Sequence, residues 1–221
     1  MNTTESPVLL VLGAGPGLGL AVARRFAREG YLAVLATRTE ADAEPLAAAL
    51  VAEGFAAEGV AVDLADPADV SAVVRGVGER HGRIDVLHFN PSFWRERNPL
   101  ELTVPELLED VALGAGVLLP AVQAARPFQS SGSRVLVTGS MAADEPNPAA
   151  ASLGVQKAAV RNLVASLDGV LADDDIRAVA VQINGALAKE GPFSPTPIAD
   201  AMWAAVARDA DGWTAHVPYD G

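Results

Sequence analysis

Gly13, Gly15, Gly17 and Gly19 stand in one short turn, Gly13-Ala14-Gly15-Pro16-Gly17-Leu18-Gly19, between an apolar run and an amphipathic stretch. Glycine allows a tight turn and carries no side chain, so backbone N–H groups at a helix N-terminus can approach a bound phosphate closely. Leu18 stands where Gly-x-Gly-x-x-Gly spacing would need its third glycine, whereas Gly-x-x-x-Gly-x-Gly spacing is met. The place of the turn between strand and helix favours a dinucleotide site over a mobile Gly/Pro loop.

Thr37-Arg38-Thr39 follows the second apolar run, at the position where NAD-selective sites hold an acid for the adenosine ribose. An acid repels a 2′-phosphate, whereas a guanidinium can bind it with two hydrogen bonds. The sequence therefore predicts NADP(H) rather than NAD(H), with a solvated loop charge as the alternative role for Arg38. Asp63-Leu64 follows the third apolar run, and these two residues would lie beside a bound adenine.

Apolar β-branched runs alternate with longer Ala-rich stretches along the whole chain, and this alternation predicts a parallel sheet covered by helices on both faces. The predicted strands are 8–12, 31–36, 59–62, 84–89, 134–138, 176–183 and 213–217. The predicted helices are 18–29, 40–53, 66–81, 105–126, 149–171 and 197–207. We expect residues 1–221 to form one domain, with a short substrate lid at 184–196.

The composition excludes several classes of protein. The chain has 221 residues, a net charge of −12, 50% hydrophobic residues and no cysteine. So apolar a chain is not disordered, and so acidic a chain lacks the basic face that nucleic acids need. Absent cysteine excludes disulfides and thiolate catalysis. The polar start and the short run Val8–Leu12 resemble neither a signal peptide nor a membrane span, so we expect a soluble, cytoplasmic protein.

Taken together, the motifs resemble the short-chain dehydrogenase/reductase family over essentially the whole chain. The matching features are the glycine turn, Asp63, Ile84-Asp85-Val86-Leu87, Val137-Thr138-Gly139-Ser140, Lys157-Ala158-Ala159-Val160 and the closing Val217-Pro218-Tyr219-Asp220-Gly221. The resemblance implies a Rossmann-type, doubly wound α/β fold with seven parallel strands in the order 3-2-1-4-5-6-7. It also implies NADP(H)-dependent oxidoreduction of a small organic substrate, with Ser140 and Lys157 as the catalytic serine and lysine.

The chain departs from the family pattern at several functional positions. Asn-Asn-Ala-Gly is replaced by Phe89-Asn90-Pro91-Ser92, and the asparagine of the proton relay by Ala112 or Leu113. Pro-Gly is replaced by Asn184-Gly185, and the threonine that follows it by Lys189. The largest departure is Leu153, four residues before Lys157, where the family has its catalytic tyrosine.

The missing tyrosine changes the expected chemistry. In the family, the tyrosine protonates the carbonyl oxygen, the serine steadies that oxygen, and the lysine holds the ribose and lowers the pKa of the tyrosine. General acid catalysis contributes roughly 10²–10⁴ in rate, so Leu153 should impair ordinary carbonyl reduction. Ser140 can still donate a hydrogen bond to an oxyanion. Asp144 and Glu145 are candidate replacement acids or bases, with solvated loop carboxylates as the alternative.

The resemblance places cofactor-binding and substrate residues at defined positions. The cofactor set is Gly13, Gly15, Gly17, Leu18, Gly19, Thr37, Arg38, Thr39, Asp63, Leu64, Asn90, Lys157, Gly185 and Leu187. The substrate set is Ser92, Trp94, Asp144, Leu153 and Phe193. Arg95 or Arg97 would suit an acidic substrate or the surface. His81, His88 and His216 have no metal-site spacing, and His88 suits a core position.

Three functional hypotheses follow. The first is an NADP(H)-dependent oxidoreductase with an atypical active site, acting on a substrate such as an activated alkene or an iminium. The second is a non-redox lyase, isomerase or cyclase on the same scaffold. The third is a catalytically dead NADP(H)-binding sensor. We favour the first, because so many cofactor groups are retained. Ala- and Gly-rich helix faces at 112–125 and 149–165 also suit close pairing into a homodimer or homotetramer.

Overall fold

A computed structural model describes residues 6–209 and 211–221 of the chain. Seven parallel strands form one sheet in the order β3-β2-β1-β4-β5-β6-β7, which confirms the predicted topology. The strands are β1 (Val8–Leu12), β2 (Leu32–Thr37), β3 (Ala57–Ala61), β4 (Val86–Phe89), β5 (Arg134–Ser140), β6 (Arg177–Ile183) and β7 (His216–Tyr219). The α-helices are α1 (Leu18–Ala27), α2 (Glu40–Ala52), α3 (Pro67–His81), α4 (Val104–Val111), α5 (Leu118–Ala125), α6 (Ala151–Leu171) and α7 (Pro195–Val206).

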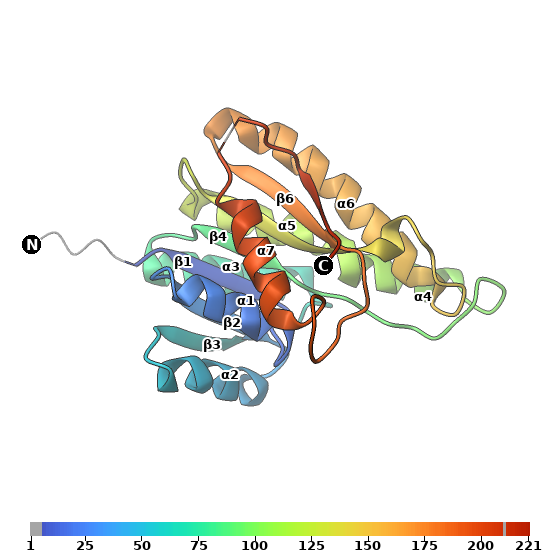
Figure 1. The fold of residues 1–221 in the computed structure, drawn as a ribbon, viewed down its shortest axis with the longest axis horizontal. Helices are drawn as coiled ribbons and strands as arrows, with labels where there is room; N and C mark the ends of the chain where they lie inside the picture. The colour runs from blue at the N-terminus through green and yellow to red at the C-terminus, as the bar shows by residue number, and fades with distance from the viewer. Residues whose placement is uncertain (1–5, 210) are drawn as a thin grey trace, which may run out of the picture.

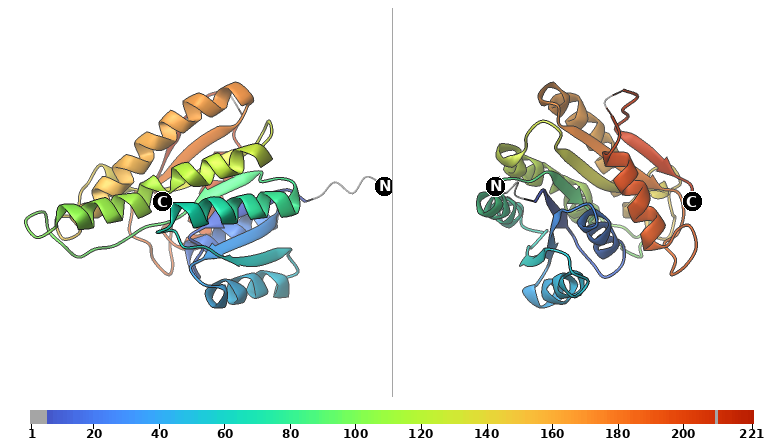
Figure 2. Two further views of the ribbon diagram at one scale, coloured as in Figure 1. Left: turned by 180° about the vertical axis from the view of Figure 1, so that it is seen from behind. Right: turned by 60° about the vertical axis from the view of Figure 1, so that its left-hand side comes forward.

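Helices cover both faces of the sheet (Figure 1). One hydrophobic core lies between the sheet and the helices α1, α2 and α7. In it, Phe26 of α1 is fully buried and its ring packs against Trp203 of α7. The other lies between the sheet and α3, α5 and α6, as the rear view shows (Figure 2). β1 is buried at every position because it lies in the middle of the sheet with a core on each side.

Local sequence signals set several helix starts. Asp66 accepts a hydrogen bond from the Ala68 N–H at the start of α3, and Pro67 follows at the first helical position. Thr103 and Glu106 form a reciprocal capping box at the start of α4. Thr39 caps α2 by accepting from the Asp42 N–H. These caps fix where the loops after β2, β3 and β4 end.

The predicted helix 105–126 is divided into two α-helices in the structure. α4 and α5 are joined by the π-helical turn η1 (Ala112–Gly116), which contains two of the glycines that interrupt the apolar pattern. By length and composition alone, the run Val104–Phe128 would also suit a membrane span. In this fold its segments pack against α3 and α6.

The bounds of the two edge strands differ from the prediction. β3 begins at Ala57 rather than Gly59, and β7 spans His216–Tyr219 rather than 213–217. An edge strand is only partly buried, so apolar runs mark its bounds poorly. Trp213 belongs to the preceding loop, where its ring lies beside the guanidinium groups of Arg134, Arg177 and Arg208.

Candidate functional site

A cavity of about 960 Å³ lies along the carboxyl edge of the sheet. Parallel strands bring their carboxyl ends to one edge, and there the loops after the strands meet. The lining residues are Gly13, Ala14, Gly15, Pro16, Leu18, Gly19, Thr37, Arg38, Ala41, Asp42, Pro45, Leu46, Val62, Asp63, Leu64, Ala65, Asn90, Pro91, Ser92, Leu113, Thr138, Gly139, Ser140, Leu153, Lys157, Ile183, Gly185 and Leu187.

The glycine turn is folded tightly against the ends of β1 and β2. Gly13 has a φ of +77°, which favours glycine, and the N–H groups of Gly13 and Ala14 both donate to the Ala36 carbonyl. A Cβ on Gly19 would lie 2.9 Å from the Ala14 Cα, so the close approach of helix and turn requires glycine. A Cβ on Gly15 would meet no atom within 4 Å, although Gly15 lines the cavity. The chain itself does not require glycine there, whereas a closely bound ligand would.

The first turn of α1 provides an anion-binding end to this cavity. Backbone N–H groups in a first helical turn lack intrahelical partners, and the helix dipole places partial positive charge there. The first turn of α1 contains no acidic residue. Leu18 and Gly19 begin this helix and line the cavity. The residues therefore fit a pyrophosphate at this position.

Arg38 lies at the edge of the cavity, immediately after β2. Its side chain is exposed, and within residues 6–209 and 211–221 no hydrogen bond or ion pair engages it. Thr37 lines the cavity and donates its hydroxyl to the Thr39 carbonyl. Asp63, after β3, accepts from the Ala65 N–H. This end of the cavity therefore combines a free guanidinium with a fixed backbone, as binding of a phosphate monoester requires.

A chain of partly buried hydrogen bonds runs beneath the glycine turn. Thr138 Oγ1 donates its proton to Asn90 Oδ1 at 2.7 Å, and Asn90 Nδ2 donates to the Gly13 carbonyl at 2.9 Å. His88 Nε2 lies 3.0 Å from Thr138 Oγ1 and must be the donor, because the single hydroxyl proton goes to Asn90. Burial lowers the pKa of His88 to about 3, so its ring is neutral. His88 is a core residue that supports the turn.

Ser140, Leu153 and Lys157 all line the cavity. Ser140 ends β5, and its Oγ accepts from the Ala142 N–H at 3.2 Å. Lys157 projects from α6, and its Nζ donates to the carbonyls of Pro91 and Thr138, each at 3.1 Å. Leu153 stands one helical turn before Lys157, so the two side chains share a helix face. No phenol is present at the position where the resemblance implies one.

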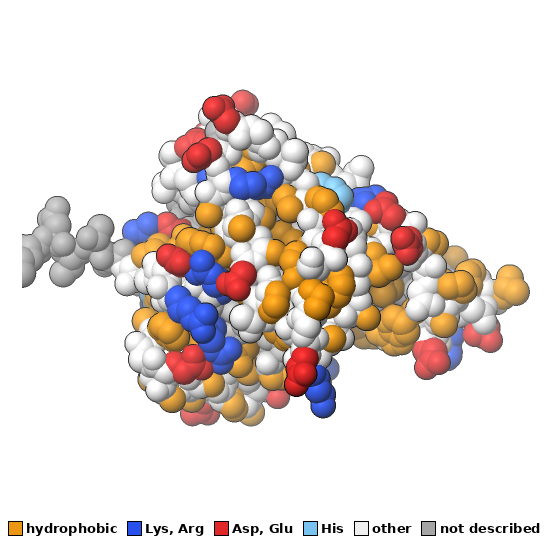
Figure 3. Space-filling view, viewed as in Figure 1, with side chains coloured by type: hydrophobic (Ala, Val, Ile, Leu, Met, Phe, Trp, Pro, Cys, Tyr) orange, Lys and Arg blue, Asp and Glu red, His pale blue; other side chains and the backbone are white. Residues whose placement is uncertain are grey.

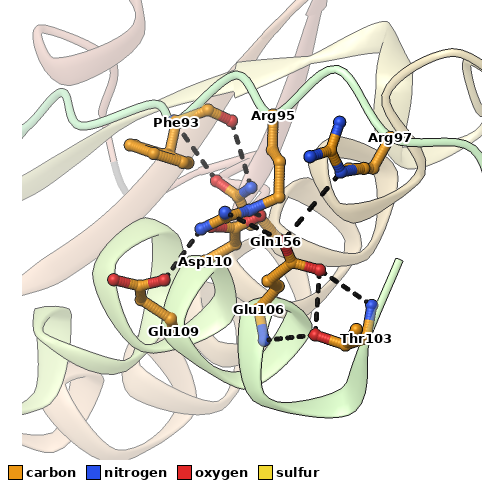
Figure 4. Close-up of polar contacts among 8 residues, drawn as sticks. All are labelled: Phe93, Arg95, Arg97, Thr103, Glu106, Glu109, Asp110 and Gln156. Atoms are coloured by element: carbon orange, nitrogen blue, oxygen red, sulfur yellow. Dashed lines mark hydrogen bonds and ion pairs between the residues drawn. The ribbon is translucent and has the colours of Figure 1, made fainter. Parts of the chain in front are cut away.

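The segment 90–98 after β4 is fastened to two helices (Figure 4). Gln156 of α6 accepts from the Phe93 N–H at 3.3 Å and donates to the Phe93 carbonyl at 3.1 Å. Arg95 forms a two-pronged ion pair with Asp110 of α4, whose side chain is buried, and also reaches Glu109. Arg95 is thus held by carboxylates of its own chain, which removes it from the residues free to bind an acidic substrate.

Other predicted site residues do not line the cavity: Gly17, Thr39, Trp94, Asp144 and Phe193. Asp144 forms an ion pair with Arg161 at 2.7 Å, and this contact and Gln182 hold the pKa of Asp144 at about 2. Asp144 therefore has no proton to donate near neutral pH, contrary to its predicted role as a replacement acid. Phe193 packs on Tyr219, over Gly185, and Trp94 is 56% exposed.

Sequence reasoning missed part of the wall of the cavity. Ala41, Asp42, Pro45 and Leu46 line it from α2, although nothing in their spacing distinguishes them from a surface helix. Thr138 was recognised only as part of a motif, and its hydroxyl proves to connect His88 with Asn90. A polar residue near the end of a buried strand is the signal that could have identified it.

Comparison with known proteins supports the assignment of this architecture. Residues 7–188 match the family described as short chain dehydrogenase. NovJ of Streptomyces niveus, a short-chain reductase protein, is 28% identical over 210 residues, covering 94% of this chain and 77% of that protein. A protein of Streptomyces virginiae described as a ketoacyl reductase of the monensin polyketide synthase is 46% identical over 87 residues. That match spans only 33% of the relative and 39% of this chain.

Solved structures share the fold at low sequence identity. A dehydrogenase/reductase from Sinorhizobium meliloti superposes with a TM-score of 0.87 at 23% identity, covering 97% of this chain and 94% of that one. A metagenomic short-chain oxidoreductase, solved in complex with NADP, superposes with a TM-score of 0.85 at 24% identity, covering 96% of each chain.

Proposed function

Since the chain belongs to the short-chain dehydrogenase family, we propose that it is an NADP(H)-dependent oxidoreductase of small organic substrates whose active site lacks the family's tyrosine. The observation that carries the choice of cofactor is Arg38, which lies at the cavity edge after β2 without an ionic partner in the described part of the chain. The NADP bound to the metagenomic relative supports the same choice.

The cofactor would be held along the whole sheet edge. The glycine turn and the start of α1 would bind its pyrophosphate, Arg38 its 2′-phosphate, and Asp63 and Leu64 its adenine end. Asn90, Lys157, Gly185 and Leu187 would border the nicotinamide end. When bound, such a cofactor supplies or accepts a hydride.

Two leucines add apolar surface to the cavity. Leu113 from η1 and Leu153 from α6 both line it, as does Ser140. An apolar wall excludes water and strengthens the hydrogen bond that Ser140 can donate to developing negative charge. We propose an activated alkene or an iminium as the substrate, since neither requires a tyrosine to protonate a carbonyl oxygen.

A fluorescence titration of the purified, cofactor-free protein with NADPH and NADH tests the cofactor assignment. Tight and NADPH-selective binding, followed by NADPH oxidation with a panel of electrophiles, is the expected result. Absence of binding to either dinucleotide would contradict the proposal. It would instead favour a non-redox lyase, isomerase or cyclase, for which the apolar wall of Leu113 and Leu153 would shape the substrate. Binding without any turnover would favour a sensor.

Substitution of Gly19 by valine tests whether the glycine turn holds the cofactor. A Cβ at Gly19 meets the Ala14 backbone at 2.9 Å, so the turn must shift away from α1. We expect NADPH affinity to fall by about 10²-fold, equivalent to about 3 kcal/mol. Isothermal titration calorimetry measures the affinity. Gly76→Ala is the control, because a Cβ at Gly76 meets nothing within 4 Å. Equal affinity of the two variants would contradict this role of the turn.

We further propose that residues 184–196 act as a short lid over a single domain and that the protein works in the cytoplasm. The lid begins where β6 ends, and its Gly185 and Leu187 line the cavity. Its far end is anchored, since the Tyr219 hydroxyl donates to the Pro192 carbonyl and the Ala188 N–H donates to the Phe193 carbonyl. The part free to cover a substrate is therefore short.

The predicted pairing face at 112–125 is largely taken up within the chain, where α5 packs against α3. We therefore propose that the chain pairs through the outer faces of α4 and α6. An apolar groove of about 480 Å³ lies between Pro99–Leu107 and Pro146–Val155. Val104, Leu108 and Val155 are large apolar residues that stand exposed on these helices. Hydrophobic side chains are visible along this end of the molecule (Figure 3). An exposed apolar area of this kind is typical of a protein–protein contact.

Val104→Glu tests the pairing surface. Val104 is 68% exposed and opens α4, where an acidic residue suits the helix dipole, so folding should be preserved. Like charges facing each other across an interface cost several kcal/mol, and we expect association to weaken by about 10²-fold. Light scattering measures the molar mass. Val51→Glu, on the exposed side of α2, is the control. A wild-type monomer would contradict the proposal.

A further inference from the structure

The lid, residues 184–196, folds back on itself and makes a compact loop. The Ala188 N–H donates to the Phe193 carbonyl at 3.0 Å, which brings the two arms of the loop together. The Phe193 ring lies against Gly185, where a Cβ would stand 2.4 Å from a ring carbon. Glycine is therefore required at position 185, and the place of the ring decides where the backbone of Gly185 can lie.

Tyr219 of β7 holds the Phe193 ring from outside the lid. The two rings pack edge to face, with 5.8 Å between their centroids and 83° between their planes. The Tyr219 hydroxyl also donates to the carbonyl of Pro192, the residue before Phe193. Tyr219 is itself fixed, because it pairs with Ile183 in the sheet and its carbonyl accepts from the Asn184 N–H at 2.9 Å. The side chain of Tyr219 thus holds the far arm of the lid, while its backbone holds the start.

The near arm of the lid forms part of the cavity wall. Gly185 and Leu187 both line the cavity, and the proposed function places them beside the nicotinamide end of the cofactor. Leu187 is 60% exposed, so its own packing restrains it little. Gly185 has no side chain to anchor it, and the Phe193 ring lies against its backbone. The contacts of Tyr219 therefore reach the cavity wall through Phe193.

We propose that Tyr219 is a positioning residue of the active site. Through Pro192 and Phe193 it holds Gly185 and Leu187 in the arrangement that binds the nicotinamide half of the cofactor. The inference rests on the proposed function for the identity of this ligand. The contacts themselves form between residues of the chain, so the lid is ordered in the cofactor-free protein too. Such preorganisation raises affinity, because binding then need not order the loop.

Proteolysis of the cofactor-free protein tests whether Tyr219 orders the lid. A lysyl endopeptidase cleaves after lysine, and the chain has two lysines: Lys157 is 3% exposed within α6, and Lys189 is exposed in the lid. Tyr219→Phe removes one hydrogen bond, so we expect cleavage at Lys189 to quicken by about 3–10-fold. Tyr31→Phe is the matched control, since it removes the hydroxyl of the only other tyrosine. Equal cleavage rates in Tyr219→Phe and the wild-type protein would overturn the proposal.

Ligand binding, measured by calorimetry, supplies the second readout. We expect the dissociation constant of NADPH to rise by about 3–10-fold in Tyr219→Phe, because binding must then order the lid. Adenosine 2′,5′-bisphosphate lacks the nicotinamide half and should bind the variant and the wild-type protein equally. An unchanged affinity for NADPH, or equal losses for the two ligands, would overturn the proposal. If the wild-type protein fails to bind NADPH, the proposed function fails instead, and cleavage at Lys189 still decides whether Tyr219 orders the lid.

Discussion

Leu153→Tyr should raise carbonyl reduction by NADPH by about 10²–10⁴-fold over the wild-type protein, the usual contribution of a general acid. Leu153 lines the cavity one helical turn before Lys157, and Ser140 borders the same space. A phenol at this position would stand beside a cation, which favours its ionised form and so strengthens it as an acid. Steady-state NADPH oxidation with aromatic ketones and aldehydes measures the gain.

Leu153→Phe is the matched control, since phenylalanine places the same ring in the cavity without the hydroxyl. We expect no gain in carbonyl reduction from Leu153→Phe, and a lower rate with bulky substrates as the ring fills space. Equal rates for the two variants would show that the leucine does not limit carbonyl reduction. The cavity would then differ from the family's active site by more than the missing tyrosine.

Arg38→Asp should invert the preference between the two dinucleotides. Two charge-assisted hydrogen bonds to the 2′-phosphate would be lost, each worth about 1.5–3 kcal/mol, and the new carboxylate would repel that phosphate. We expect NADPH affinity to fall by about 10²-fold or more, and NADH affinity to rise as the acid binds the ribose diol. The ratio of the two dissociation constants, measured by fluorescence titration, checks this.

Arg28→Asp provides the control for charge. Arg28 is also an exposed arginine, at the C-terminal cap of α1, and does not line the cavity. The substitution Arg28→Asp changes the net charge by the same amount as Arg38→Asp, so a general effect of charge on dinucleotide binding would appear in both variants. An unchanged ratio of the two dissociation constants in Arg38→Asp would show that Arg38 is only a solvated surface charge. Other residues would then determine which cofactor binds.

The parts of the fold that depend on local chemistry were predictable. A buried strand, a glycine turn and an amphipathic helix follow one another from Val8 to Ala27, and each has a distinct pattern in the sequence. The bounds of β3 and β7 were less predictable, because an edge strand is buried on fewer sides and needs fewer apolar residues. The π-helical turn lies where Gly114 and Gly116 interrupt the apolar pattern, but two glycines do not by themselves distinguish a π-helical turn from the end of a helix.

The candidate site divides in the same way. Residues that follow strands, such as Arg38 and Asn90, could be placed because strand ends meet at one edge. The ion pair of Asp144 could not be predicted, because its partner Arg161 lies on another element, 17 residues away. The position of the Lys157 Nζ depends on where two carbonyls, from β5 and from the segment 90–98, come together. Contacts of this kind, between elements far apart in the sequence, are visible only in the tertiary structure.

The fastening of the segment 90–98 limits how this protein can change over evolution. Loops usually tolerate inserted and deleted residues. This one is held through Asn90, Pro91, Phe93 and Arg95, so a residue gained or lost between these anchors would move some of them out of register with the others. Exchange of the side chains between those anchors, Ser92 and Trp94, leaves the contacts intact. Of these two residues, Ser92 lines the cavity, so substrate preference on this side of the cavity would diversify by substitution of Ser92 at fixed loop length.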